Sequence, residues 1–146
     1  MKEITKVVVD AMGGDNAPHE IIKGAVEAVG KSDAIHVILV GKEDVINQEL
    51  SGYTYNKEQI SVVHTSEVIE TAEPPVMAIR RKKDSSIVVG LKMVKDKEAD
   101  AFVSAGSSGA VLAGGQLLVG RIKGVERPPL APLIPTEKGF SILIDC

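Results

Sequence analysis

The sequence predicts an α/β protein in which helices cover a mostly parallel sheet. Short apolar runs alternate with amphipathic stretches, which is the β–α–β pattern of a doubly wound fold. The composition agrees, since 44% of the 146 residues are hydrophobic but only 3% are aromatic and none is Trp. A core of Val, Ile, Leu and Ala suits a parallel sheet that is buried on both faces.

The first strand is expected at residues 6–10, followed by a turn and a helix. The turn contains the glycine pair 13–14, and Asp15 or Asn16 is expected to cap the helix. The helix has one apolar face, and Gly30 is expected to end it. The residues of that face are Ile21, Ile22, Ala25, Val26 and Val29.

The next two strands are expected at 35–40 and 60–64, with a short helix between them over 41–50. The acidic and weakly patterned stretch 65–73 predicts a loop at the carboxyl edge of the sheet. A helix is then expected to begin at Pro74-Pro75. This alternation extends the doubly wound pattern through the first half of the chain.

The pattern centres on a glycine loop at residues 104–110, Ser-Ala-Gly-Ser-Ser-Gly-Ala. Before the loop come a helix expected at 87–97, capped within 84–86, and a buried strand at 100–103. After it comes a long helix at 111–122, which is apolar enough to pack against the sheet. Glycines let the backbone approach a ligand, and the first N–H groups of a helix lack partners, so such a loop is a ready anion site. The alternative is a tight turn whose glycines serve packing alone.

The last quarter of the chain reads as weaker β-structure. The prolines in 130–135 predict an edge or irregular strand there, because proline cannot donate a backbone hydrogen bond within a sheet. Residues 140–146 predict an apolar strand. Because the sequence stops inside that strand, we expect these residues to be part of a longer protein.

Charge and cysteine content exclude several classes of protein. The net charge of −3 gives no global attraction to nucleic acid or to an anionic membrane. A single cysteine, Cys146, excludes an internal disulfide and a cysteine-based zinc site. No signal peptide or membrane-spanning run is expected, so the reducing cytoplasm is the expected location.

Templates for nucleotide binding do not fit the glycine-rich stretches. The gap from Gly109 to Gly114 matches a P-loop, but Gly115 stands where Lys is required. The stretch 106–109 lacks the first G-x-G of a dinucleotide-binding fingerprint. A small anion, held by backbone N–H groups and by the two serine hydroxyls of this stretch, fits the loop better.

A second polar cluster lies at the end of the first strand. Asp10, Asp15 and Asn16 flank the glycine pair 13–14 at the edge where open α/β sheets bind ligands, so two loops on one edge favour a cleft. Asp15 as a simple helix cap is the alternative. The carboxylates suit Mg²⁺, but no third ligand stands at a recognisable spacing, and no metal is expected.

The densest basic cluster is Arg80-Arg81-Lys82-Lys83. The helix dipole favours cations at a helix C-terminus, so a solvated helix end explains it. The alternative is a surface that docks an acidic partner or holds an anionic substrate.

Several blocks of the sequence together match the pattern of a known family. They are residues 8–18, 73–76, 78–86, 104–106, 109–110, 119–128, 131–132 and 135–136. These blocks resemble bacterial phosphate acyltransferases, the fatty acid and phospholipid synthesis proteins that make acyl-phosphate from acyl-acyl carrier protein and orthophosphate. One departure is Ser107-Ser108, where the family usually has Asn-Thr. The other is length, because family members are much longer and their pattern continues past Asp145.

The resemblance implies a three-layer α/β/α fold with a mostly parallel sheet, similar to phosphate acetyltransferases and the isocitrate dehydrogenase-like group. Residues 1–146 would be the amino-terminal portion of a larger acyltransferase, inactive by itself. The second half would help to form the cleft and a homodimer. No cofactor is implied.

The resemblance also implies a reaction in which bound phosphate attacks the acyl thioester and expels the carrier thiol. The implied phosphate-binding residues are Gly106, Ser107, Ser108, Gly109 and Ala110. The implied catalytic residues, which hold phosphate or orient a proton, are Asp10, Asp15, Asn16 and Ser108. The implied carrier-protein or anion contacts are Arg80, Arg81, Lys82 and Lys83.

Two other functions remain open at this point. The same fold and chemistry serve phosphate acetyl- or butyryltransferases that use coenzyme A thioesters. The second alternative is not an enzyme but a non-catalytic phosphate-binding module. The phospholipid synthesis pathway of the family also implies peripheral contact of the protein with the inner face of the cell membrane, although these 146 residues contain no amphipathic anchor.

Overall fold

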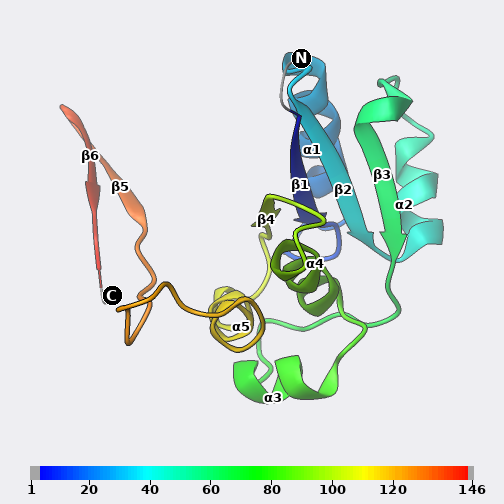
Figure 1. The fold of residues 1–146 in the computed structure, drawn as a ribbon. Helices are drawn as coiled ribbons and strands as arrows, with labels where there is room; N and C mark the ends of the chain where they lie inside the picture. The colour runs from blue at the N-terminus through cyan, green and yellow to red at the C-terminus, as the bar shows by residue number, and fades with distance from the viewer. Residues whose placement is uncertain (1–3, 145–146) are drawn as a thin grey trace.

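The computed structural model describes residues 4–144, and its centre is a four-stranded parallel sheet (Figure 1). The strand order is β3-β2-β1-β4, and Val8 of β1 pairs with Ile38 on one side and Phe102 on the other. The strand bounds are β1 Thr5–Asp10, β2 Ile35–Gly41, β3 Ile60–His64 and β4 Ala101–Val103. Each apolar run expected to form a parallel strand does so within a residue or so of its expected ends.

Helices connect these strands and cover the sheet. Their bounds are α1 His19–Lys31, α2 Glu43–Leu50, α3 Pro75–Arg81, α4 Ser86–Lys95 and α5 Ser108–Gly114, with a 3₁₀ helix η1 at Lys57–Gln59 and a π-helical turn η2 at Gly115–Val119. Among the described residues, no helix is long and apolar enough to cross a membrane.

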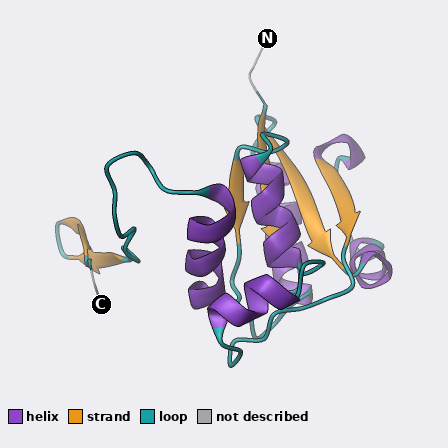
Figure 2. Ribbon diagram, turned by 60° about the horizontal axis from the view of Figure 1, so that its bottom comes forward, coloured by secondary structure: helices purple, strands orange, loops and turns teal. Residues whose placement is uncertain are grey.

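The sheet lies between two helical layers, so the expected α/β/α arrangement is confirmed (Figure 2). On one face, Leu39 of β2 packs with Ile22 of α1 and Ile46 of α2. On the other face, Val8 and Val40 pack against α4. Successive strand residues point to opposite faces, which is why neighbours 39 and 40 belong to different cores. Burying each such side chain contributes about 1.5–3 kcal/mol.

Helix α5 and the turn η2 form one helical run from Ser108 to Val119, which packs against α3 and α4. A Cβ on Gly114 would lie 2.4 Å from Leu91 Cδ1, so a larger residue would displace the end of the Leu91 side chain where this run crosses α4. Compared with the helix expected at 111–122, the observed run starts and ends three residues earlier in the sequence. It packs on helices rather than on the sheet.

Three local expectations are wrong. Pro18 is the N-cap residue of α1 without a side-chain cap; Glu20 N–H donates instead to the carbonyl oxygen of Asn16 at 3.1 Å. The same helix continues through Gly30 and ends at Lys31. Strand β4 is expected to be buried, but Val103 is 53% exposed. The reason is that β4 is the end strand of the sheet and has a neighbouring strand on one side only.

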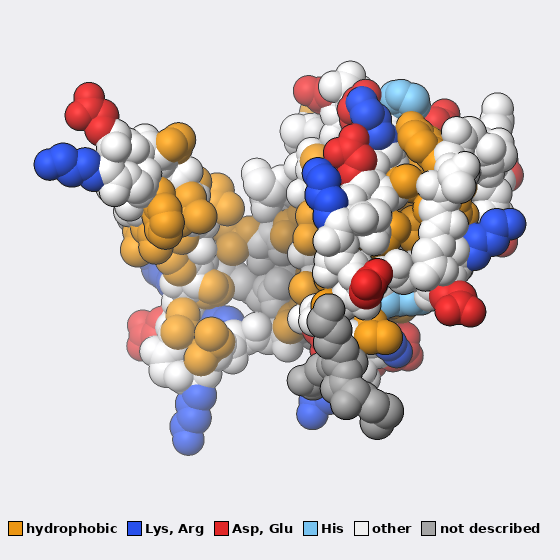
Figure 3. Space-filling model, turned by 90° about the horizontal axis from the view of Figure 1, so that it is seen from above, with side chains coloured by type: hydrophobic (Ala, Val, Ile, Leu, Met, Phe, Trp, Pro, Cys, Tyr) orange, Lys and Arg blue, Asp and Glu red, His pale blue; other side chains and the backbone are white. Residues whose placement is uncertain are grey.

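The chain after η2 leaves the sheet and ends in a separate antiparallel hairpin of β5 Leu133–Thr136 and β6 Gly139–Ile142. The hairpin stands apart from the body in Figure 1, and its apolar side chains gather on the arm at the left of Figure 3. Every residue of both strands is exposed. The strand expected at 140–146 is thus confirmed only up to Ile142, and its last two residues lie outside the described part.

Candidate functional site

The strand order places a topological switch point between β1 and β4. From β1 the chain winds outward through β2 to β3, and it then returns to place β4 on the other side of β1. The loop after β1 leads to α1 on one face of the sheet, and the loop after β4 leads to α5 with α3 and α4. Crevices at such points, outside the carboxyl ends of the strands, are where open α/β sheets bind ligands.

The two loops at this point are in direct contact through glycines. A Cβ on Gly13 would lie 2.3 Å from Asp10 Oδ2 and 2.9 Å from the backbone nitrogen of Gly106. A Cβ on Gly106 would lie 3.1 Å from Gly13 Cα. Gly14 has φ +111° and sits against Ala105. Only residues without a Cβ let the two backbones approach this closely.

Asp10, the last residue of β1, links the two loops through hydrogen bonds. Its side chain is 1% exposed, and its Oδ2 accepts a hydrogen bond from Ser104 Oγ at 2.7 Å. Its Oδ1 accepts from Met12 N–H at 3.1 Å, and Ser104 Oγ accepts in turn from Gly106 N–H at 3.0 Å. A buried carboxylate needs such donors, because an unpaired charge away from water is costly. The network fixes the glycine loop against the loop that follows β1.

Ser104 is the residue of this network that sequence reasoning did not place in the site. It belongs to the glycine loop, yet 94 residues separate it from Asp10. The available signal was positional: both residues end apolar strands that pair side by side. Residues at the carboxyl ends of adjacent parallel strands meet at one edge of the sheet.

The start of α5 divides its two serines between different roles. Ser107 is buried and its Oγ accepts from Ala110 N–H at 3.2 Å, which is an N-cap contact. Ser108 is exposed at the first position of the helix and lines the adjacent cavity. Gly109 lies against α3, where an added Cβ would be 2.9 Å from Pro75 Cγ. The Ser108 hydroxyl is therefore available to a ligand, whereas Ser107 holds the helix start.

The remaining candidates on the first loop, Asp15 and Asn16, are exposed in the turn before α1. The main chain of Asn16 is bound to α1 through its carbonyl oxygen. Asp10 is the candidate of this loop that the structure brings into contact with the glycine loop.

The basic cluster does not act as one surface. Lys82 is half-buried, and its Nζ donates to the Val68 carbonyl at 2.6 Å and to Glu73 Oε1 at 2.5 Å. The hydrogen bond from Lys82, with a second from the Glu70 backbone N–H, lowers the pKa of Glu73. Lys82 thus ties the 65–73 loop to α3.

The other three cations of the cluster, Arg80, Arg81 and Lys83, are exposed. They lie at the end of α3, which packs directly on α5. An acidic ligand held by these side chains would consequently be close to the helix that begins in the glycine loop.

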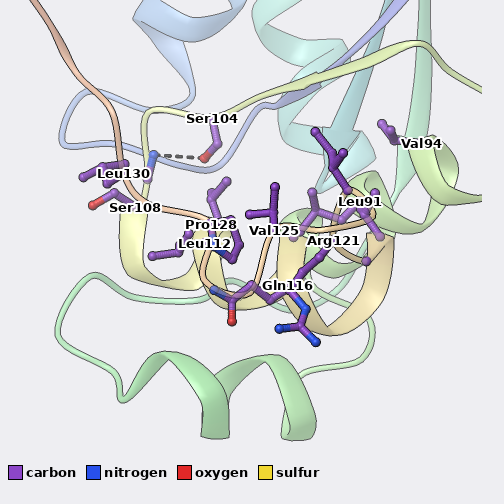
Figure 4. Close-up of a pocket in the computed structure, with 16 residues that line it drawn as sticks. Leu91, Val94, Ser104, Ser108, Leu112, Gln116, Arg121, Val125, Pro128 and Leu130 are labelled. Carbon is purple, nitrogen blue, oxygen red and sulfur yellow. Dashed lines mark hydrogen bonds between the residues drawn. The ribbon is translucent and has the colours of Figure 1, made fainter. Parts of the chain in front are cut away.

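A cavity of about 630 Å³ opens beside the glycine loop (Figure 4). Ser104, Gly106 and Ser108 line it at one end, and mostly apolar residues of α4, α5, η2 and the following segment form the rest, together with Gln116 and Arg121. Within residues 4–144, no three His, Cys, Asp or Glu side chains are grouped to hold a metal ion. The chemistry available here is that of backbone N–H groups, hydroxyls and a buried carboxylate next to an apolar groove.

Comparison with known proteins agrees with this picture. The sequence model of a family described as "Fatty acid synthesis protein" matches residues 5–146. A phosphate acyltransferase of Alkaliphilus oremlandii is 60% identical over 140 residues, covering 96% of this chain and 42% of that protein. One from Clostridium novyi is 56% identical over 97% of this chain and 42% of its own length. The chain thus spans less than half the length of these curated relatives.

Two solved structures share the fold at low sequence identity. A phosphotransacetylase from Streptococcus pyogenes superposes with a TM-score of 0.64 at 13% identity, covering 95% of this chain and 46% of that chain. The EutD phosphotransacetylase from Staphylococcus aureus gives a TM-score of 0.57 at 18% identity, over 97% and 45% of the two chains. These likenesses confirm the expected relationship of the fold to phosphate acetyltransferases.

Proposed function

Since the chain belongs to the fatty acid synthesis protein family, we propose that it forms the amino-terminal part, residues 1–146, of a phosphate acyltransferase. The enzyme would transfer a fatty acyl group from acyl-acyl carrier protein to orthophosphate and so make acyl-phosphate for phospholipid synthesis. The single observation that supports this most is the pair of interlocked glycine loops at the switch point of the sheet, next to an apolar cavity.

The transfer needs no covalent enzyme intermediate. An oxygen of hydrogen phosphate attacks the thioester carbonyl carbon, a C–O bond forms, and the C–S bond breaks. The phosphate proton goes to the leaving thiolate, so acyl-phosphate and a free thiol are the products. The protein's contribution is to hold the dianion and the thioester in line and to stabilise the developing oxyanion.

The glycine loop would hold the phosphate through residues 106–110. The exposed Ser108 hydroxyl would donate to it directly, while Ser107 would act through the helix start that it caps. Asp10 is buried, so it would position the loop through Ser104 rather than touch phosphate. Asp15 and Asn16 would form the opposing lip of the site.

The exposed cations Arg80, Arg81 and Lys83 would meet the acidic carrier protein and steer its approach. Lys82 would support this surface from its ion pair with Glu73. We include in the proposal a homodimer, a cytoplasmic location with peripheral contact at the membrane, and further active-site groups in the part of the relatives that this chain does not cover.

The test is phosphate-dependent thiol release by the complete gene product that carries this chain, with acyl-acyl carrier protein and acyl-coenzyme A as separate substrates. Release from the carrier substrate, absent without orthophosphate, is the expected result. A preference for coenzyme A thioesters would favour the acetyl- or butyryltransferase alternative. Phosphate binding without thiol release from either substrate would refute an enzyme and favour a binding module.

A Ser108→Ala variant tests the loop itself. Loss of one hydrogen bond to a charged group costs about 1.5–3 kcal/mol, so kcat/KM should fall about 10- to 150-fold. The matched control is Ser51→Ala, which removes an exposed serine at the end of α2. An unchanged kcat/KM for Ser108→Ala would remove this hydroxyl from the mechanism.

A further inference from the structure

The helical run from Ser108 to Val119 turns a continuous stripe of side chains toward the cavity. Ser108, Leu112, Gly115 and Val119 follow one another at intervals of three or four residues and all line it. At a rise of 1.5 Å per residue, the stripe extends about 16 Å from the glycine loop. The cavity is therefore an elongated groove along the helix.

The walls of this groove are mostly apolar, and no other segment of the described residues 4–144 covers them. Leu91 and Val94 of α4 form one side, and Ile122, Val125 and Leu130 of the segment after η2 form the other. Ile122 is 80% exposed, and Leu112 and Val119 on the floor are 37% and 40% exposed. Exposed apolar surface that is concave and contiguous marks a binding site.

The groove has a cluster of hydroxyl and backbone N–H groups at one end and mostly apolar side chains along the rest of its length. Ser104, Gly106 and Ser108 stand at the end formed by the glycine loop. Gln116 and Arg121 also line the groove, beyond the first turns of the helical run (Figure 4), and the Arg121 guanidinium donates to the carbonyl oxygen of Glu126. A ligand that matches this arrangement has one polar, anion-adjacent end and a long apolar body.

We propose that this groove binds the fatty acyl chain, with the thioester carbonyl at Ser108 and the methyl end directed toward Val119. This inference rests on the proposed function, which supplies the acyl substrate. Burial of the chain along the stripe would strengthen binding about fourfold per methylene group. The length of the groove then sets which acyl chains are transferred best.

Gly115 is the position that tests the groove most directly. A Cβ on Gly115 meets nothing within 4 Å, whereas its neighbour Gly114 faces Leu91. The backbone at Gly115 is helical, with φ −56° and ψ −46°, so a leucine fits without strain. Gly115→Leu would fill the groove midway while leaving the protein core untouched.

The experiment compares kcat/KM for palmitoyl- and octanoyl-acyl carrier protein in the complete gene product, its Gly115→Leu variant and Gly24→Leu. Gly24 is the matched control, because it is exposed on α1 with nothing within 4 Å of an added Cβ. Loss of contact with two or three methylenes should lower the palmitoyl-to-octanoyl ratio about 15- to 60-fold in Gly115→Leu. The ratio should stay unchanged in Gly24→Leu.

The outcomes separate the groove from the proposed function. If the unmodified protein releases no thiol in a phosphate-dependent manner, the proposed function fails. If it does, but Gly115→Leu leaves the ratio unchanged or loses both activities equally, the acyl groove is refuted. A lower melting temperature or a changed oligomeric state of Gly115→Leu with an unchanged ratio would show that protein covers this face, and would also refute the inference.

Discussion

Gly13→Ala should destabilise the fold far more than an ordinary glycine-to-alanine change. The new methyl group would lie 2.3 Å from Asp10 Oδ2 and 2.9 Å from Gly106 nitrogen, both well inside van der Waals contact. Asp10 cannot move away freely, because it is buried and accepts hydrogen bonds from Ser104 and Met12. The strain must therefore separate the two loops or break the Asp10 network.

The expected cost follows from these contacts. Overpacking a closed site costs about 1–3 kcal/mol, and weakening a hydrogen bond to a charged group adds about 1.5–3 kcal/mol. We therefore expect a loss of about 3 kcal/mol or more. At about 2–4 °C per kcal/mol for a chain of this size, the melting temperature should fall by roughly 6–12 °C.

Thermal unfolding of the 146-residue chain, followed by far-ultraviolet circular dichroism, measures this effect. Gly30→Ala is the matched control, since Gly30 is exposed in α1 and an added Cβ meets nothing within 4 Å. That variant should gain about 0.5–1 kcal/mol from helix propensity. If Gly13→Ala melts together with the unmodified chain, the interlocked arrangement of the loops is wrong.

Two further predictions concern single hydrogen bonds. Ser104→Ala removes one donor from the buried Asp10 carboxylate and should lower the free energy of unfolding by about 1.5–3 kcal/mol, seen as a lower urea midpoint; an unchanged midpoint would contradict the network. Glu73→Gln tests the ion pair with Lys82. The pKa of Glu73 is lowered from 4.5 in the folded state, chiefly by the hydrogen bond from Lys82. The pair therefore stabilises the protein at pH values above 4.5, and this contribution is lost as the pH falls through the pKa of Glu73 in the folded protein. Urea titrations between neutral pH and the acid range should show a smaller decline in stability for Glu73→Gln, and an identical decline would refute the assignment.

The parallel sheet was predictable because each strand carries its own signal. Runs such as Val7-Val8-Val9 and Ile38-Leu39-Val40 are apolar enough to be buried on both faces, and turn residues bound them. The cap of α4 was equally local: Ser85 accepts from Val88 N–H at 3.4 Å, as the sequence predicts. Local rules succeed where the deciding contacts lie within a few residues.

The site was predictable only in outline. That two glycine-containing loops share one edge of the sheet follows from the parallel direction of the strands, but the contact between Gly13 and Gly106 depends on the strand order, which places β4 beside β1. The Ser104–Asp10 bond spans 94 residues, and nothing local to Asp10 indicates it. The mistaken side-chain cap from Asp15 or Asn16 has the same origin, because the tertiary position of the turn decides which oxygen meets α1.

The groove was missed for a different reason. The sequence predicts that the apolar helix at 111–122 packs against the sheet, because hydrophobicity alone does not indicate which element covers an apolar face. In the structure, Gly114 turns toward Leu91 while Leu112 and Val119 face the cavity. Adjacent glycines at 114 and 115 thus have opposite surroundings, a distinction that composition cannot make.

The β5–β6 hairpin has a consequence for how the chain behaves alone. Within residues 4–144 its two strands pair only with each other, so each has one edge whose N–H and C=O groups are free to template another strand. Pro135 in β5 has no N–H to donate to an added strand, so β5 is the poorer template for strand pairing. Strand β6 contains no proline and exposes the apolar side chains of Phe140 and Ile142. In concentrated solution, self-association of the 146-residue chain should begin by edge-to-edge growth at β6.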